Sequence, residues 1–171
     1  MPILMRVSDY AALLGRLTSA GVRYVVVGGI AVVLQGHTRA TIDLDLAIDL
    51  DTQNVLRTID VLTASGLVSR LPVDPKSFAD AAIRQKWVEQ KNLLVFTLHH
   101  PTNPVMTVDL FAVEPIPFSD LWQHADIIDV AGSPIRVASI PDLITMKRLA
   151  NRLQDLADIA KLEQMGKERS K

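Results

Sequence analysis

The clearest hydrophobic pattern in the chain is a strict alternation of apolar and polar residues over residues 41–50. Because successive strand residues point to opposite faces of a sheet, this alternation predicts a β-strand with one buried face. The expected buried face consists of Ile42, Leu44, Leu46, Ile48 and Leu50, and the other face carries Thr41, Asp43, Asp45, Ala47 and Asp49. The carboxylates at 43 and 45 therefore lie side by side.

The rest of the pattern predicts helices and short strands in mixed order. Ser8 is the expected cap of a helix that ends near Gly21, and Thr52 that of a helix ending near residue 65. The other expected helices cover 30–35, 118–124, 141–152 and 155–166, and the other strands cover 23–27, 93–99, 105–113, 127–130 and 135–137. Residues 71–90 are ambiguous, with a short helix around 78–84. The mixture predicts one α/β (α+β) domain over residues 1–171.

Composition excludes several classes of protein. The chain has 171 residues, of which 49% are hydrophobic, and it contains no cysteine. Disulfide scaffolds, thiolate zinc sites and cysteine nucleophiles are therefore excluded. The N-terminus does not resemble a secretion signal, and the apolar runs are shorter than the roughly 20 residues that span a bilayer. We expect a cytoplasmic protein with no membrane partner.

The formal net charge of −1 gives no overall attraction for nucleic acid. An RNA would therefore have to bind a local basic surface, such as Arg148, Arg152 and the C-terminal tail.

Three aspartates are candidate metal ligands. Adjacent carboxylates such as Asp43 and Asp45 repel each other unless a cation lies between them, and Mg²⁺ is the hard cation that suits oxygen ligands. Asp109, in the strand-like segment TVDLF, joins them if its strand lies beside that of residues 41–50. Three such carboxylates are typical of a two-metal site. The alternative is a solvated acidic strand face.

Phosphate-binding groups are also present. Gly28 and Gly29 end a strand just before a helix, where backbone N–H groups can approach a phosphate, although a tight turn needs the same small residues. Arg39 could bind a phosphate or form an ion pair with Asp43 or Asp49. Lys147 lies beside the buried stripe of its helix, so it either extends to solvent or reaches a negative partner.

These residues resemble the motif of the nucleotidyltransferase superfamily, which has the DNA polymerase β type of fold. They are most similar to the AbiEii-like branch of abortive-infection toxins. The motif reads Gly28, Gly29, Ala31, Gly36, Arg39, Thr41, Asp43 and Asp45, with Asp109 as the later carboxylate. The resemblance covers roughly residues 22–113, and a helical segment over about 141–166 carries the Lys, Arg and Asp pair of the relatives. Gly29 replaces a frequent serine, and Gln154 replaces a frequent lysine.

The resemblance implies a small mixed sheet flanked by helices, with C-terminal helices closing the cleft. It also implies transfer of a nucleoside monophosphate from an NTP to an acceptor hydroxyl, dependent on Mg²⁺ or on Mn²⁺ in its place. The metal ligands would be Asp43, Asp45 and Asp109, and the nucleotide would be bound by Gly28, Gly29, Arg39 and Lys147. Further cleft residues would be Thr41, Arg152, Asp155 and Asp158, although the last two also suit the N-cap and N3 positions of a helix.

The implied acceptor is tRNA or another RNA, and the protein would be a toxin with a cognate antitoxin partner. Three other interpretations stay open. The chain could be a small-molecule nucleotidyltransferase of the antibiotic-modifying kind, a non-catalytic module that binds a nucleotide or a partner, or a structural domain with acidic strand faces.

Overall fold

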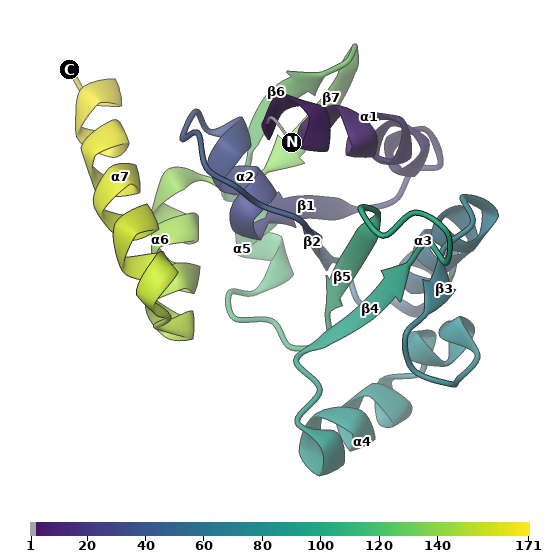
Figure 1. Ribbon diagram of the computed structural model, residues 1–171. Helices are drawn as coiled ribbons and strands as arrows, with labels where there is room; N and C mark the ends of the chain where they lie inside the picture. The colour runs from purple at the N-terminus through teal and green to yellow at the C-terminus, as the bar shows by residue number, and fades with distance from the viewer. Residues whose placement is uncertain (1–2) are drawn as a thin grey trace.

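A mixed β-sheet forms the centre of the computed structural model, which describes residues 3–171 (Figure 1). In this part of the chain the sheet has seven strands, in the order β3-β4-β5-β2-β1-β7-β6. Their bounds are β1 (Tyr24–Val27), β2 (Leu44–Ile48), β3 (Val68–Ser69), β4 (Val95–His99), β5 (Thr107–Phe111), β6 (Asp126–Val130) and β7 (Ser133–Val137). Strand β2 runs antiparallel to β1 and parallel to β5.

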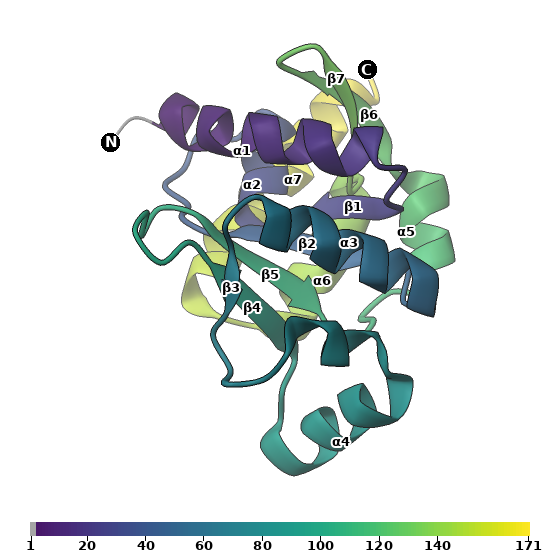
Figure 2. The same cartoon turned by 90° about the vertical axis from the view of Figure 1, so that its right-hand side faces the viewer.

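Helices cover both faces of the sheet. They are α1 (Ile3–Ser19), α2 (Gly28–Leu34), α3 (Thr52–Ala64), the 3₁₀ helix η1 (Pro75–Ala79), α4 (Ala81–Lys91), α5 (Phe118–His124), α6 (Ile140–Ala150) and α7 (Leu153–Arg169). In Figure 2, α1 and α3 lie in front of the sheet and α6 and α7 lie behind it. The expected α/β class, with a mixed sheet flanked by helices, is confirmed. Across residues 3–171, we find no helix with the length and apolar character to cross a membrane.

The core fills the space between the sheet and helices α1 and α3 and also includes buried residues of α2, α6 and α7. Leu44 and Leu46 of β2 and Val108 and Leu110 of β5 are fully buried, as the alternation requires. The alternating segment is longer than the strand, because β2 covers only Leu44–Ile48. Ile42, expected in the core, is 57% exposed, since it precedes the strand and lacks a neighbour that would cover it.

Helix starts show where local signals were misleading. Helix α1 begins at Ile3, so Ser8 lies inside the helix and is not its cap. The cap of α3 is Asp51 and not Thr52, because the Asp51 carboxylate accepts hydrogen bonds from the backbone N–H of residues 53 and 54. The ambiguous segment 71–90 contains η1 and most of α4, and the capping Asp80 accepts bonds from two N–H groups of the first turn of α4.

Candidate active site

The strand register brings two of the candidate carboxylates together. Asp45 on β2 is paired with Asp109 on the parallel neighbour β5, and on its other side it is paired with Val27 of β1. Paired residues of neighbouring strands project from the same face of a sheet. Asp45 and Asp109 are therefore direct neighbours, and Gly28 follows at the end of β1.

The carboxylates repel one another. Burial, followed by the charges of Asp109 and Asp43, raises the pKa of Asp45 from 3.8 to about 7, although Arg152 and Lys147 act in the opposite direction. Asp43 lies just before β2, and its pKa is also raised, first by burial and then by Asp109. The free protein therefore holds negative charges at a distance where a cation would relieve their repulsion.

A hydroxyl group orients the third carboxylate. Thr97 on β4 is paired with Asp109, and its Oγ1 donates a hydrogen bond of 2.6 Å to Asp109 Oδ1. One oxygen of Asp109 is thereby fixed. Sequence reasoning missed Thr97, because its role depends on the register between β4 and β5; the expected hairpin gave the only signal for it.

The two glycines contact the carboxylate site directly. Gly28 begins α2 with a φ of +68°, in the left-handed region, and a Cβ added there would collide with the Asp45 carboxylate. A Cβ at Gly29 would collide with the Thr41 hydroxyl and lie 2.8 Å from Arg39 Nη1. Both positions require glycine for close approach, and the glycine bend brings Asp45, Thr41 and Arg39 to one place.

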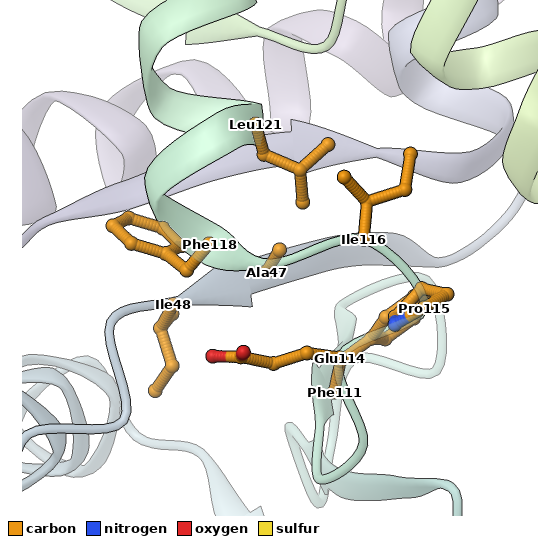
Figure 3. Close-up of a pocket in the computed structure, with 8 residues that line it drawn as sticks. All are labelled: Ala47, Ile48, Phe111, Glu114, Pro115, Ile116, Phe118 and Leu121. Atoms are coloured by element: carbon orange, nitrogen blue, oxygen red, sulfur yellow. The ribbon is translucent and has the colours of Figure 1, made fainter.

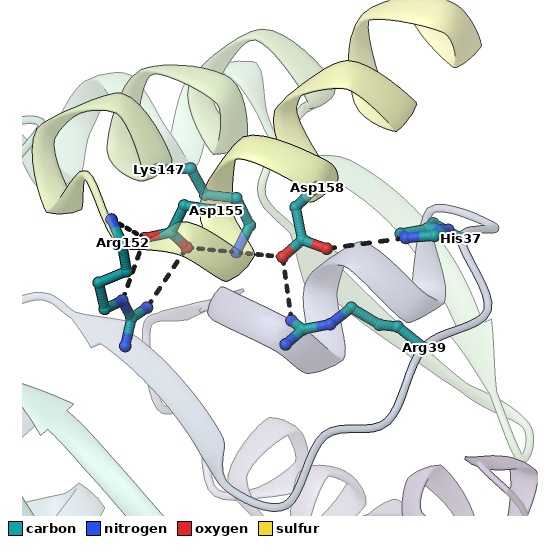
Figure 4. Close-up of polar contacts among 6 residues, drawn as sticks. All are labelled: His37, Arg39, Lys147, Arg152, Asp155 and Asp158. Atoms are coloured by element: carbon teal, nitrogen blue, oxygen red, sulfur yellow. Dashed lines mark hydrogen bonds and ion pairs between the residues drawn. The ribbon is translucent and has the colours of Figure 1, made fainter.

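A group of charged side chains, which we call the charge cluster, joins α6 and α7 to the loop after α2 (Figure 4). Its members are His37, Arg39, Lys147, Arg152, Asp155 and Asp158. Three cations that carry a charge at neutral pH face two carboxylates here. One positive charge is therefore left over, before any protonation of His37.

Lys147 is the buried centre of the charge cluster. Its side chain is 7% exposed, and Nζ lies 2.9 Å from Asp158 Oδ2 and 3.4 Å from Asp155 Oδ1. Of the two alternatives for Lys147, solvent or a negative partner, the structure shows the second, because two aspartates of α7 pair with it. Burial of a lysine is favourable only with such partners.

Arg39 and Arg152 occupy the two ends of the cluster. Arg39 Nη1 lies 3.2 Å from Asp158 Oδ2, so the alternative ion pair with Asp43 or Asp49 is wrong, and Asp49 instead pairs with Arg23 at 3.3 Å. Arg152 Nε lies 3.0 Å from Asp155 Oδ2.

The capping roles expected for two aspartates are corrected. Arg152 is the N-cap residue of α7, and Asp155 is the N3 residue whose carboxylate accepts a bond from the Arg152 backbone N–H. Asp158 lies one turn further along the helix. Burial acts to raise the pKa of Asp155, but hydrogen bonds from Arg152, followed by the charges of Arg152 and Lys147, lower it below its usual value. Asp155 therefore remains a carboxylate inside the cluster.

Comparison with known proteins gives a match at the level of structure. No family model matches the sequence, and no curated protein matches it. The structure is similar to lincosamide antibiotic adenylyltransferase LnuA bound to lincomycin, with 16% identity, a TM-score of 0.61, and 96% of this chain and 99% of that chain covered. It is also similar to an antigenic nucleotidyltransferase-like protein from Paracoccidioides brasiliensis, with 19% identity, a TM-score of 0.60, and 96% of this chain and 77% of that chain covered. A third similar structure is ANT(2″)-Ia in complex with adenylyl-2″-tobramycin, with 14% identity, a TM-score of 0.59, and 94% of each chain covered.

The chain has the nucleotidyltransferase fold. In this fold, β1, β2 and β5 bring together the glycine bend and the two paired aspartates. The α6–α7 segment, from the other end of the sequence, supplies four members of the charge cluster, and the loop after α2 supplies the other two.

The carboxylate oxygens are ligands that a hard divalent cation prefers. In the part of the chain that the structure describes, no three His, Asp or Glu side chains are already grouped as ligands of one metal ion. Mg²⁺ does not require such a group, since it is usually held by one or two carboxylates together with water and substrate phosphates. The pair Asp45 and Asp109, with its mutual repulsion, meets that requirement.

A small cavity lies further along the same sheet face. It measures about 10 Å³, room for about one water molecule, and is lined by Ala47, Ile48, Phe111 and residues of the 114–121 segment (Figure 3). Ala47 and Phe111 follow Asp45 and Asp109 by two residues on β2 and β5. The 114–121 segment therefore covers the strand face beyond the carboxylates and leaves the carboxylates themselves outside the cavity.

Proposed function

We propose that the protein is a nucleotidyltransferase that moves a nucleoside monophosphate from an NTP to an acceptor hydroxyl. The observation that carries this proposal is the contact between Gly28 and Asp45, with Asp109 beside Asp45 in the register of the sheet. A glycine bend that can bind phosphate and carboxylates that can bind Mg²⁺ thus meet at one point.

Residues on either side of Asp45 would bind the triphosphate. The N–H groups of Gly28 and Gly29 lie at the start of α2, and Arg39 lies against Gly29. The surplus positive charge of the charge cluster, which also includes Lys147 and Arg152, offsets part of the phosphate charge. Thr41, Asp155 and Asp158 would lie on this side of the bound nucleotide, and the two aspartates would hold the cations in place.

The carboxylates would promote the transfer. Asp43, Asp45 and Asp109 would hold Mg²⁺, or Mn²⁺ in its place, which when bound supplies charge neutralisation at the phosphates. The acceptor oxygen forms a bond to the α-phosphorus while the bond to pyrophosphate breaks, and Asp109 takes the proton of the acceptor hydroxyl. Catalysis of this kind depends mainly on positioning and on charge stabilisation.

An RNA acceptor is the first candidate, supported by the likeness of the sequence motifs to the AbiEii-like toxins. In this form of the proposal the protein is a cytoplasmic toxin that modifies tRNA or another RNA and is controlled by a cognate antitoxin. The basic surface that RNA binding requires would include Arg148 and Arg152.

A small-molecule acceptor is the second candidate, and two observations favour it. LnuA and ANT(2″)-Ia, which share the fold over nearly their whole length, are described with lincomycin and with adenylyl-2″-tobramycin. In addition, the arginines that would attract RNA are already paired, Arg148 with Glu163 at 2.6 Å and Arg152 with Asp155 at 3.0 Å. An antibiotic-like alcohol needs no such basic surface.

Transfer of label from α-³²P-NTPs tests the proposal. The protein is incubated with each NTP, Mg²⁺, and either total RNA or a panel of aminoglycosides and lincosamides. We expect label on one class of acceptor, its loss in Asp45→Asn, and its retention in the matched control Asp49→Asn, since Asp49 pairs with Arg23 away from the site. Steep loss of acceptor binding with salt identifies RNA. Label transfer that survives Asp45→Asn, or a wild type that neither transfers label nor binds Mg–NTP, contradicts the proposal.

A further inference from the structure

The buried hydroxyl of Tyr10 connects the two backbone segments that carry the candidate metal ligands. Tyr10 lies on α1, is fully buried, and is far from every motif in the sequence. Its Oη lies 2.9 Å from the carbonyl oxygen of Ile42, 2.8 Å from that of Val105 and 2.9 Å from that of Thr107. It also accepts a 3.0 Å hydrogen bond from the Thr107 N–H.

These contacts lie next to the carboxylates. Ile42 is the residue before Asp43, and Thr107 begins β5 two residues before Asp109. Residues 37–43 belong to no strand, so Asp43 lacks the ladder of hydrogen bonds that fixes Asp45. The Tyr10 hydroxyl has one proton, so it attaches the backbone at Asp43 to the start of β5 when it donates to the Ile42 carbonyl while accepting from the Thr107 N–H.

We propose that Tyr10 is a positioning residue for the metal site of the proposed nucleotidyltransferase, on which this inference rests. Its hydroxyl holds the backbone that carries Asp43 against the strand that carries Asp109. Asp45 is paired with Asp109 in the sheet and Asp43 precedes β2, so an attachment outside the side chains helps to keep these like-charged groups together. Residues that support metal ligands in this way typically contribute 10- to 100-fold to metal affinity or activity.

The chain offers a matched control in its other tyrosine. Tyr24 is also buried, at 4% exposure, and its hydroxyl bonds to Thr18 Oγ1 at 2.8 Å and donates to the Leu14 carbonyl at 3.1 Å. These partners lie in α1, away from the carboxylates. Tyr24→Phe therefore removes an equally buried, hydrogen-bonded hydroxyl without touching the segments at Ile42 and Thr107.

Titration of the full chain with Mn²⁺, in the presence of a non-hydrolysable ATP analogue and followed by electron paramagnetic resonance, tests the inference. We expect Tyr10→Phe to weaken Mn²⁺ binding about tenfold or more and Tyr24→Phe to leave it within about twofold. In an Asp43→Asn background, the effect of Tyr10→Phe should disappear, because the residue acts through Asp43. Equal Mn²⁺ affinities in the two tyrosine variants, or an unchanged effect in the Asp43→Asn background, overturn the inference. Absence of Mn²⁺–nucleotide binding in the wild type contradicts the proposed function instead.

A measurement on the wild type covers the case in which Tyr10→Phe does not fold. If the hydroxyl and the metal stabilise the same arrangement, binding of the Mg²⁺–nucleotide analogue must slow hydrogen exchange at the Thr107 amide, since coupling between two sites is reciprocal. The Gly132 amide, bonded to Asp129 in the β6–β7 turn, serves as the control and should not change. Equal slowing at both amides, or none at Thr107, overturns the inference.

Discussion

Replacing Asp45 by asparagine should stabilise the free protein at pH 8 while abolishing metal-dependent nucleotide binding. Asp45 lies between Asp109 and the glycine bend, and its pKa is raised from 3.8 to about 7 by burial and by its acidic neighbours. A carboxylate with a raised pKa is destabilising when ionised. Asparagine has the same shape and no charge, so the substitution removes the repulsion and retains the packing.

The size and pH range of the effect follow from linkage between proton binding and folding. Between about pH 4 and pH 7 the folded state keeps a proton at Asp45 that the unfolded chain has lost, so stability falls as pH rises through this range. A shift of about 3 pH units corresponds to about 4 kcal/mol at 1.36 kcal/mol per unit, which is an upper limit. Because Asp45 is half-buried and borders solvent, we expect about 1–2 kcal/mol.

Urea unfolding at pH 5 and pH 8, with and without Mg²⁺, checks this expectation. Asp45→Asn should exceed the wild type in unfolding free energy at pH 8, with a smaller difference at pH 5, and Mg²⁺ with nucleotide should stabilise the wild type alone. The control Asp49→Asn should show no such gain, because Asp49 is paired with Arg23. A less stable Asp45→Asn protein at pH 8, or a gain equal at both pH values, would refute the reasoning.

Three further substitutions test other parts of the site. Gly28→Ala should lower the unfolding free energy by about 1–3 kcal/mol and prevent Mg–NTP binding, because the added methyl group would collide with the Asp45 carboxylate at a residue with positive φ. A variant that binds Mg–NTP as tightly as the wild type in calorimetric titration would contradict this prediction. Thr97→Val should reduce the transfer rate about tenfold or more, because it removes the hydroxyl that bonds to Asp109, and Thr97→Ser should retain the wild-type rate. Equal rates in the wild type and both variants would contradict the role given to this hydroxyl. Asp158→Asn should cost about 3–5 kcal/mol in urea unfolding, because Arg39 loses its carboxylate partner and buried Lys147 keeps only Asp155; a loss below about 1 kcal/mol would show the Asp158 charge to be dispensable.

The parts of the fold and site that were predictable are those encoded by short-range patterns. The alternation around Asp45 predicted a strand with carboxylates on one face, and the same parity argument placed Asp109 on the corresponding face of its own strand. Only the adjacency of the two strands was needed to bring these aspartates together, and the register confirms it. The glycine bend was predictable because two glycines at the end of a strand indicate a tight turn or a close approach of the backbone to another group.

The parts that could not be predicted depend on contacts between distant segments. Nothing in the local sequence indicates that Arg39 pairs with Asp158 or that Lys147 is buried between two aspartates. The spacing of charged residues along the chain does not identify an ion-pair partner that is distant in the sequence. Tyr10 has the pattern of any buried aromatic residue on an amphipathic helix. The direction of its hydroxyl is set by the packing of α1 against the sheet, which the sequence alone does not reveal.

The two halves of the site differ in how far they are stabilised without substrate. The charge cluster is internally neutralised except for one positive charge, so its cations are already held in place before a nucleotide arrives. Among the described residues, Lys147, Arg152 and Arg70 offset the repulsion of the carboxylates, but they do not restore the usual pKa of Asp45 or Asp43. A metal ion would offset the repulsion among the carboxylates, and the surplus positive charge of the cluster would attract a triphosphate. The metal ion and the triphosphate also attract each other, and we therefore expect the metal and the nucleotide to increase each other's affinity.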